Sequence, residues 1–192
     1  MAFFTGYVTL PITSYSAWKS AVNGNGYNAD GYYGCQCWDL TAEFWWNVGF
    51  PQGYPLTGPN HGASECWTVN SYNNISYNGT QYFDLIENKN DIKQGDVVVF
   101  AGSPGHIGFA DSDYNGGEYI SILGQNQGSS GVPTPIPHPD GGTTTNVANL
   151  NASGILGAFR YREWGGGPTP PTPTRKRGKF PWVLYARKLR AN

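Results

Sequence analysis

The run GGGPTPPTPT at residues 165–174 sets the strongest limit on how this chain can fold. Proline lacks an N–H donor and holds its own φ fixed, and a run of Pro, Gly and Thr has little apolar surface to bury. This run is therefore typical of a stiff, extended linker, and the core has to be built from the residues before it. We predict a domain over residues 1–164, the linker over 165–174 and a tail over 175–192.

Charge divides the chain at the same linker. All 13 Asp and Glu residues lie at or before Glu163, whereas seven of the 12 Lys and Arg residues lie between Arg175 and Arg190. The first 174 residues thus carry five basic and 13 acidic side chains, a formal charge of −8, and the tail carries +7. Because the tail also holds six bulky apolar residues, we expect it to bind an anionic surface or a partner protein. No recognised motif supports nucleic-acid binding.

Apolar spacing predicts several helices. Residues 14–22 have apolar side chains at helical spacing behind the possible caps Thr13 and Ser14, and CWDLTAEFWWNV at 37–48 indicates a buried helix. We also expect a helical turn near 62–69, within an irregular excursion, and a short helix over TQYFDLIE at 80–87.

Strand signals dominate the second half of the domain. DVVVFA at 96–101, HIGFADS at 106–112 and EYISILGQ at 118–125 are separated by Gly-containing turns and predict an antiparallel meander. The proline-rich residues 128–146 predict a loop, and ILGAFRYR at 155–162 predicts a closing strand. Together with the helices, these strands indicate an α+β domain.

The chain has three cysteines, so at least one is a free thiol, a metal ligand or an intermolecular partner. A Cys35–Cys66 bridge is conceivable, whereas Cys35-Gln36-Cys37 lacks the ligand spacing of a zinc site. No run of 18 apolar residues occurs, and the first residues, MAFFTGYVTLP, lack the basic and apolar regions of a signal peptide. We therefore expect neither a membrane helix nor an export signal.

Cys37 is the candidate nucleophile. It stands in the first turn of a predicted helix, where unpaired N–H groups and the helix dipole favour a thiolate. A cysteine nucleophile needs a nearby imidazole, and His106 opens a predicted strand after a Pro-Gly turn. Asn126, at the end of the next strand, can hold the imidazole in the correct orientation. From the residues alone, a structural role for Cys37 as a small buried side chain remains the alternative.

Three segments then resemble a known family. YYGCQCWDLTAEFWW, QGDVVVFAGSPGHIGFAD and ILGQNQG are similar, in order and spacing, to the catalytic segments of CHAP domains, the cysteine, histidine-dependent amidohydrolase/peptidases. The resemblance spans about residues 14–164. It implies a papain-like fold in which short helices pack on an antiparallel sheet of four to six strands.

The resemblance also implies roles for individual residues. Cys37 and His106 match the family's nucleophile and base directly, and Asn126 then completes the triad. The Cys37 N–H and the Gln36 side chain become candidate oxyanion donors. The family's strand often reads Glu-Gln-Asn, whereas this chain has Gly124 in place of the acid.

As a function, the resemblance implies a cysteine-dependent peptidoglycan hydrolase, either an N-acetylmuramoyl-L-alanine amidase or an endopeptidase, in a bacteriophage endolysin or tail-associated lysin. Such a protein acts in the host cytoplasm and then on the cell wall after holin release, or on the virion tail. The basic tail would then bind teichoic acid, a membrane surface or a virion protein. Two alternatives stay open: a non-catalytic wall-binding or virion structural module, which Gly124 favours, and a peptidase or transamidase that acts on protein.

A possible Ca²⁺ loop precedes the cysteine. Asn28, Asp30 and Asp39 supply side-chain oxygens at positions 1, 3 and 12, and Tyr32 and Gly34 supply carbonyl oxygens at positions 5 and 7. This spacing resembles an EF-hand, although it has Asn at position 1 and Asp rather than Glu at position 12. Some phage lysins of the CHAP family have a similar arrangement. We expect Ca²⁺ to anchor this loop, with an ordinary Asx turn as the alternative.

Overall fold

A computed structural model describes residues 3–4, 8, 12–68, 74–128 and 130–164 of the chain. The predicted linker at 165–174 and the basic tail at 175–192 lie outside the described residues. Within the described part, no helix is long and apolar enough to cross a membrane.

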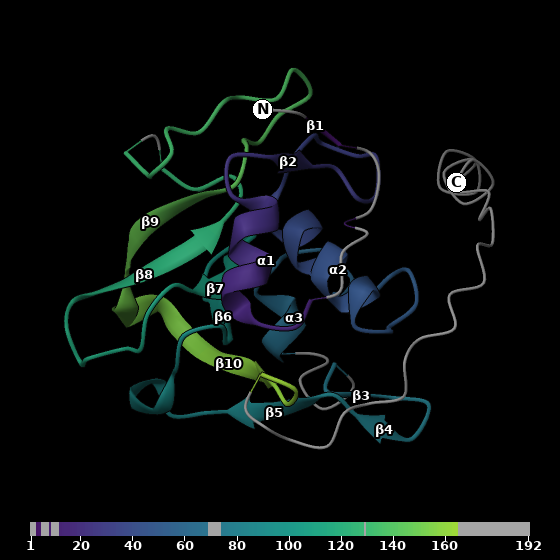
Figure 1. Cartoon of the computed structure of the whole chain (residues 1–192), viewed down its shortest axis with the longest axis vertical. Helices are drawn as coiled ribbons and strands as arrows, with labels where there is room; N and C mark the ends of the chain where they lie inside the picture. Colours follow the sequence, from purple (N-terminus) through teal and green to yellow (C-terminus); the bar gives the residue numbers. More distant parts are fainter. Residues whose placement is uncertain (1–2, 5–7, 9–11, 69–73, 129, 165–192) are drawn as a thin grey trace.

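The centre of the molecule is a six-stranded antiparallel sheet with the order β5-β10-β6-β7-β8-β9 (Figure 1). Its strands are β5 (Phe83–Ile86), β6 (Val97–Phe100), β7 (His106–Ala110), β8 (Tyr119–Gly124), β9 (Asn146–Asn151) and β10 (Ile155–Tyr161). Two short pairs lie outside this sheet: β1 (Phe3–Phe4) with β2 (Gly26–Tyr27), and β3 (Ser76–Tyr77) with β4 (Thr80–Gln81). The predicted α+β class and the antiparallel meander are confirmed.

In the part of the chain that the structure describes, three α-helices accompany the sheet: α1 (Tyr15–Val22), α2 (Cys37–Asn47) and α3 (Glu65–Thr68). Ser14 caps α1 by accepting a hydrogen bond from the Ala17 N–H at 3.1 Å, so the predicted helix over 14–22 is confirmed. Helix α2 packs against β7, in the middle of the sheet, and confirms the helix predicted over 37–48 (Figure 1). Helix α3 lies within the predicted turn near 62–69.

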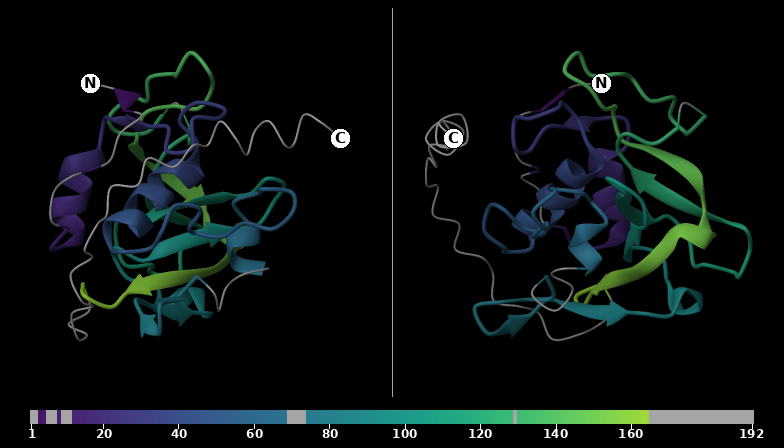
Figure 2. Two further views of the ribbon diagram at one scale, coloured as in Figure 1. Left: turned by 90° about the vertical axis from the view of Figure 1, so that its right-hand side faces the viewer. Right: turned by 180° about the vertical axis from the view of Figure 1, so that it is seen from behind.

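Alternate residues of the central strands feed two separate cores. Val97 and Val99 face the helices, in a core with Trp18, Phe44 and Trp45. The intervening residues of β6, Val98 and Phe100, face the opposite side, where 3-10 helices η1 (Lys89–Asp91) and η2 (Ala152–Gly154) adjoin the sheet. Burial of both faces explains why β6 reads as an unbroken apolar run rather than an alternating one. Seen from behind in Figure 2, β9 and β10 meet at a corner, which η2 forms.

Two predictions about elements need correction. TQYFDLIE is not a helix: it contains β4 and the edge strand β5, whose residues pair with β10 from Phe83↔Tyr161 to Ile86↔Ala158. Short apolar runs suit either period, and pairing with β10 decides the outcome here. Strand β9 was not predicted. The strand predicted over 155–162 is confirmed as β10, which lies inside the sheet between β5 and β6.

Candidate active site

Helix α2 begins at Cys37 because the preceding residue is held as its N-cap. Gln36 has an extended backbone, with φ −94° and ψ 165°, and its N–H donates to Asp39 Oδ2 at 2.8 Å. The same carboxylate accepts from the Ala29 N–H at 2.8 Å through Oδ1, so it ties the preceding loop to the first turn. Cys37 is thereby fixed at the positive end of the helix dipole.

The strand that carries His106 begins at a tight hairpin. Gly105 has φ +79°, and a Cβ at this position would lie 2.6 Å from Ser64 Cβ and 2.7 Å from Phe100 O. The Ser64 N–H donates to Pro104 O at 3.1 Å, which holds the hairpin against the start of α3. Only glycine fits this conformation and this space, so the Pro-Gly turn determines where His106 stands.

The nucleophile and base candidates come from elements in direct contact. Helix α2 packs on β7, and the backbone N–H of Ile107, the residue after His106, interacts with the Cys37 thiol. Burial of the thiol is the main cause that raises the pKa of Cys37 to about 11; the Asp39 carboxylate also acts to raise this pKa, and nearby backbone N–H groups act to lower it. Cys37 is therefore a thiol at neutral pH and needs a base to become a nucleophile.

His106 has the properties of such a base. Burial lowers the pKa of His106 below its ordinary value of 6.5, against the opposing effect of its hydrogen bond with Gln127. The ring is therefore neutral at pH 7 and can accept a proton.

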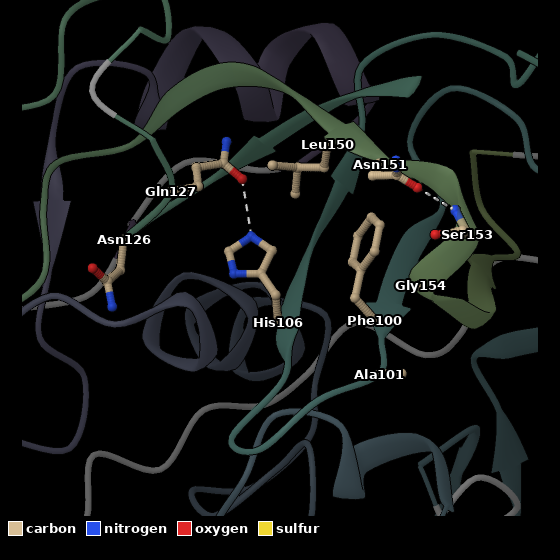
Figure 3. A pocket seen from close by; sticks show the side chains of 9 residues that line it. All are labelled: Phe100, Ala101, His106, Asn126, Gln127, Leu150, Asn151, Ser153 and Gly154. Carbon is tan, nitrogen blue, oxygen red and sulfur yellow. Dashed lines mark hydrogen bonds between the residues drawn. The ribbon is translucent and has the colours of Figure 1, made fainter. Parts of the chain in front are cut away.

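The partner of His106 is Gln127 and not the expected Asn126. His106 Nε2 lies 2.9 Å from Gln127 Oε1 (Figure 3). Asn126 has a left-handed backbone with φ +53°, and its Nδ2 donates instead to Gln36 Oε1 at 2.7 Å. The prediction that Asn126 orients the imidazole therefore differs from the geometry, because the turn after β8 directs its side chain to Gln36.

The segment Gln125–Gln127 joins both halves of the site. Gln125 Nε2 donates to Gln36 O at 2.8 Å, Asn126 binds the Gln36 side chain, and Gln127 binds His106. Gln36 Nε2 also donates to Tyr33 O at 2.6 Å, which leaves one of its two amide hydrogens for an oxyanion. Hydrogen bonds thus hold both the oxygen and the nitrogen of the Gln36 amide, as a preorganised donor requires. Its role and that of the Cys37 N–H stay predictions.

A cavity of about 360 Å³ adjoins the imidazole (Figure 3). It opens where β6, β7 and the end of β8 face the corner between β9 and β10. Its walls combine apolar side chains with amide and hydroxyl groups, from Phe100, Ala101, His106, Asn126, Gln127, Leu150, Asn151, Ser153 and Gly154. The cavity can therefore hold an uncharged, peptide-like group next to the base.

The predicted Ca²⁺ loop is closed by its own hydrogen bonds. Asn28 Oδ1 accepts from the Gly31 N–H at 2.9 Å, and Asp30 Oδ1 accepts from the Tyr32 N–H at 2.8 Å. Asp39 is 1% exposed, and burial raises the pKa of Asp39 to about 8, with the Asp30 carboxylate as the second cause. No described Lys, Arg or His forms an ion pair with either acid. Among the described residues no group of three His, Cys, Asp or Glu side chains is placed to hold a metal.

The remaining cysteines and histidines have no part in these roles, although Cys66 lies near the candidate nucleophile: burial, and next the charge of Cys37, raise the pKa of Cys66. All three cysteines are free thiols, so the conceivable Cys35–Cys66 bridge is absent. His61 lies in an exposed loop, and His138 Nδ1 accepts a hydrogen bond from the Asp140 N–H at 3.0 Å.

The chain is similar in sequence to a phage endopeptidase and in fold to an endolysin. No protein-family model matches the chain. A D-alanyl-L-alanine endopeptidase of Streptococcus phage B30 is 36% identical over 124 residues, which are 62% of this chain and 26% of that protein. The chain therefore spans about a quarter of the length of that relative. The crystal structure of a wild-type endolysin, LysIME-EF1, is similar with a TM-score of 0.55 and 22% identity, over 78% of this chain and 64% of that one. This likeness concerns the fold, and it agrees with the predicted arrangement of helices on an antiparallel sheet.

Gln127 is the residue that sequence reasoning missed. The sequence feature that could have pointed to Gln127 is the absence of an acid at Gly124. An imidazole base that has no carboxylate partner needs an amide or backbone oxygen nearby instead. Gln125 and Gln127 both offered one, and only the turn after β8 decides between them.

Proposed function

We propose that this chain is a peptidoglycan hydrolase whose CHAP domain cleaves an amide bond by a cysteine-histidine mechanism. One observation carries the proposal: a thiol at a helix N-terminus stands against the strand of a neutral, buried imidazole, and a carbonyl oxygen holds that imidazole's other side. This is the arrangement that acyl transfer by a cysteine requires. The similarity to a phage endopeptidase supports the choice of substrate.

The proposed reaction has two stages. His106 takes the proton of the Cys37 thiol, the sulfur attacks the amide carbon, and the Cys37 N–H and the Gln36 amide stabilise the oxyanion. The tetrahedral intermediate collapses as the C–N bond breaks and His106 returns the proton to the leaving amine. His106 then takes a proton from water, the hydroxide attacks the thioester, and the carboxylic acid and the thiol are released.

We propose the bond between D-Ala and L-Ala as the substrate, in preference to the muramoyl-alanine amide. The reason is the activity for which the phage relative is named.

The test compares wall degradation by wild-type protein, Cys37→Ala and the matched control Cys35→Ala, which removes a neighbouring thiol. Purified Gram-positive walls should lose turbidity with wild type and Cys35→Ala, and new N-terminal alanine should be detected by mass spectrometry. Cys37→Ala should be folded by circular dichroism and inactive. Clearing of the walls by folded Cys37→Ala would refute the cysteine mechanism. Both candidate bonds free an alanine amine on hydrolysis, so the new carboxyl end decides between them: a free lactyl carboxyl on muramic acid without new C-terminal D-Ala would refute the bond assignment.

We further propose that Ca²⁺ binds Asn28, Asp30 and Asp39 together with the Tyr32 and Gly34 carbonyls. The donors fit a hard cation, since all are oxygens, and a cation would offset the repulsion between the two acids. The ion would fix the loop that leads to Cys37 and take no part in bond cleavage. Millimolar Ca²⁺ should raise the melting temperature of wild type by a few degrees, and a chelator should reverse the shift. An equal response in Asp30→Asn would exclude this site.

The place of action and the role of the tail are also proposals. A phage lysin acts from the host cytoplasm on the wall, or from the virion tail, and the cationic tail at 175–192 would bind teichoic acid, a membrane surface or a virion protein. Deletion of 175–192 should reduce the fraction of protein that pellets with walls. If teichoic acid is the partner, walls stripped of it should bind the full chain no better than the deletion variant.

A further inference from the structure

We propose that Gln127 is the positioning residue of the His106 base, and that its carboxamide oxygen takes the place of a side-chain oxygen that Gly124 lacks. The proposal rests on the proposed function, because it explains how the base of that reaction is held. Gln127 acts through His106 and supplies no group to the substrate's reacting atoms. Three observations support it: the contact with the ring, the orientation of the amide and the space at Gly124.

The Gln127 carboxamide has one orientation that satisfies its neighbours. Its Nε2 lies 2.7 Å from Ile122 O and 2.8 Å from Asn146 O, and both of these carbonyl oxygens can only accept hydrogen bonds. The two amide hydrogens are therefore used, and Oε1 is left to face His106 Nε2 at 2.9 Å. Gln127 is 5% exposed, so its amide is largely shielded from water.

The fixed amide determines the tautomer of the imidazole. A carbonyl oxygen cannot donate, so the hydrogen in the contact belongs to His106 Nε2. In the neutral ring, Nδ1 is then the nitrogen with the free lone pair, and Figure 3 shows it facing away from Gln127. A general base needs this lone pair, because the opposite tautomer has no place for the thiol proton at Nδ1.

Gly124 supplies the space for this arrangement. A Cβ added to Gly124 would lie 2.6 Å from Gln127 Oε1 and 3.0 Å from Gln127 Cδ. By ordinary bond lengths, the side-chain oxygen of an Asn or Asp lies about 2.4 Å from its own Cβ. A side-chain oxygen from position 124 and the Gln127 oxygen therefore compete for the same place beside His106. The chain supplies this oxygen from three residues further along, as an uncharged amide.

The experiment uses the full chain with three variants. Gln127→Ala removes the oxygen; Gly124→Asn combined with Gln127→Ala returns an oxygen from position 124. Gln81→Ala is the matched control, since its amide donates to Phe83 O at 2.9 Å, away from the site. The readouts are the initial rate of wall clearing and the tautomer of His106, observed by ¹⁵N NMR of histidine-labelled protein.

Gln127→Ala should lower the rate on the order of 10- to 100-fold and give a mixture of tautomers. The double variant should recover at least tenfold of the rate and the Nε2–H form, and Gln81→Ala should stay within twofold of wild type. Gln127→Met covers the case in which Ala loosens the loop, because Met keeps the length of the side chain but lacks the oxygen. It should give the same mixture of His106 tautomers as Gln127→Ala.

A wild-type tautomer in a folded Gln127→Ala or Gln127→Met would overturn the proposal. The proposal would also be overturned if Gln127→Ala lowered the rate, left the tautomer unchanged and was not rescued by the double variant. Gln127 would then only pack the loop. The NMR measurement needs no substrate, so it tests the contact between Gln127 and His106 independently of wall hydrolysis. Absence of wall hydrolysis in wild type would instead refute the proposed function.

Discussion

At the scale of residues, the environment of His106 makes activity dependent on pH in a specific direction. Burial lowers the pKa of His106 below 6.5. A general base works only while neutral, so kcat/KM should fall as pH drops through this lowered pKa, with the acid limb centred below pH 6.5. The stability contribution has the same sign: the unfolded chain binds a proton first, so stability is lost as pH falls below about 6.5.

The measurement is kcat/KM on soluble wall fragments between pH 4.5 and 8, with His61→Ala as the control histidine. His61→Ala should keep the acid limb where wild type has it. An acid limb centred above 6.5 in wild type would mean that the imidazole is not held in the buried, neutral form.

Residue types and spacing made Cys37 and His106 the candidates for nucleophile and base, because each stands at a point that local rules mark, a helix start and the residue after a Pro-Gly turn. The third residue was beyond such rules. Asn126 and Gln127 are adjacent, and only the left-handed φ of Asn126 directs one side chain to Gln36 and the other to His106. That φ depends on how the chain turns after β8, which sequence spacing does not encode.

At the scale of elements, the start of α2 depends on the Asp39 carboxylate. It accepts hydrogen bonds from the N–H groups of Ala29, Asp30 and Gln36, at 2.8, 3.3 and 2.8 Å. Asp39→Ala leaves these donors without a partner in a buried place, so we expect it to lower the free energy of unfolding by about 2 kcal/mol. Asp39→Asn keeps one carbonyl acceptor and removes the charge repulsion with Asp30, so its loss should be smaller.

Urea denaturation of the three proteins in a chelator measures these differences without any contribution from Ca²⁺. Equal stability of Asp39→Ala and wild type would show that the cost of burying the carboxylate offsets its hydrogen bonds, and the helix start would then need another explanation.

The hairpin before β7 offers a second test at this scale. Gly105 and Gly116 both have positive φ, +79° and +83°, yet a Cβ on Gly116 meets nothing within 4 Å, whereas one on Gly105 meets Ser64 and Phe100 O below 3.0 Å. Gly116→Ala thus carries only backbone strain, about 1 kcal/mol. Gly105→Ala adds the clash and should cost about 3 kcal/mol, with a loss of wall clearing because His106 moves.

Denaturation midpoints of the two variants give the difference directly. A cost at Gly105 no larger than at Gly116 would show that α3 yields and that the hairpin does not fix His106.

Helices and strands whose own residues show a strong apolar pattern were predictable from the sequence. Strands that form only because a distant strand pairs with them were not. Helix α2 and strands β6, β7 and β8 carry their own patterns. The run Phe83–Ile86 suits a helix as well as a strand, and becomes β5 only because β10, more than 70 residues later in sequence, offers its edge. Contacts so distant in sequence leave no local signal.

At the scale of the whole molecule, Trp164 closes the helix-side core at the end of the described residues. Its ring centroid lies 4.9 Å from that of Phe44, 5.6 Å from Tyr161 and 5.9 Å from Tyr15. This cluster joins α1, α2 and β10, so the domain boundary predicted at residue 164 coincides with a side chain that three elements share.

A chain that ends after Trp164 should therefore unfold at the same urea concentration as the full chain, because every described side chain of the helix-side core lies at or before this ring. A chain that ends after Glu163, or the full chain with Trp164→Ala, should lose about 2 kcal/mol, less than a fully buried Trp would, since Trp164 is only partly buried. Wall clearing by the chain that ends after Trp164 separates catalysis from attachment: its rate on soluble fragments should match the full chain, and its rate on intact walls should fall. A large stability loss on removal of 165–192 would instead place part of those residues in the fold and move the boundary beyond Trp164.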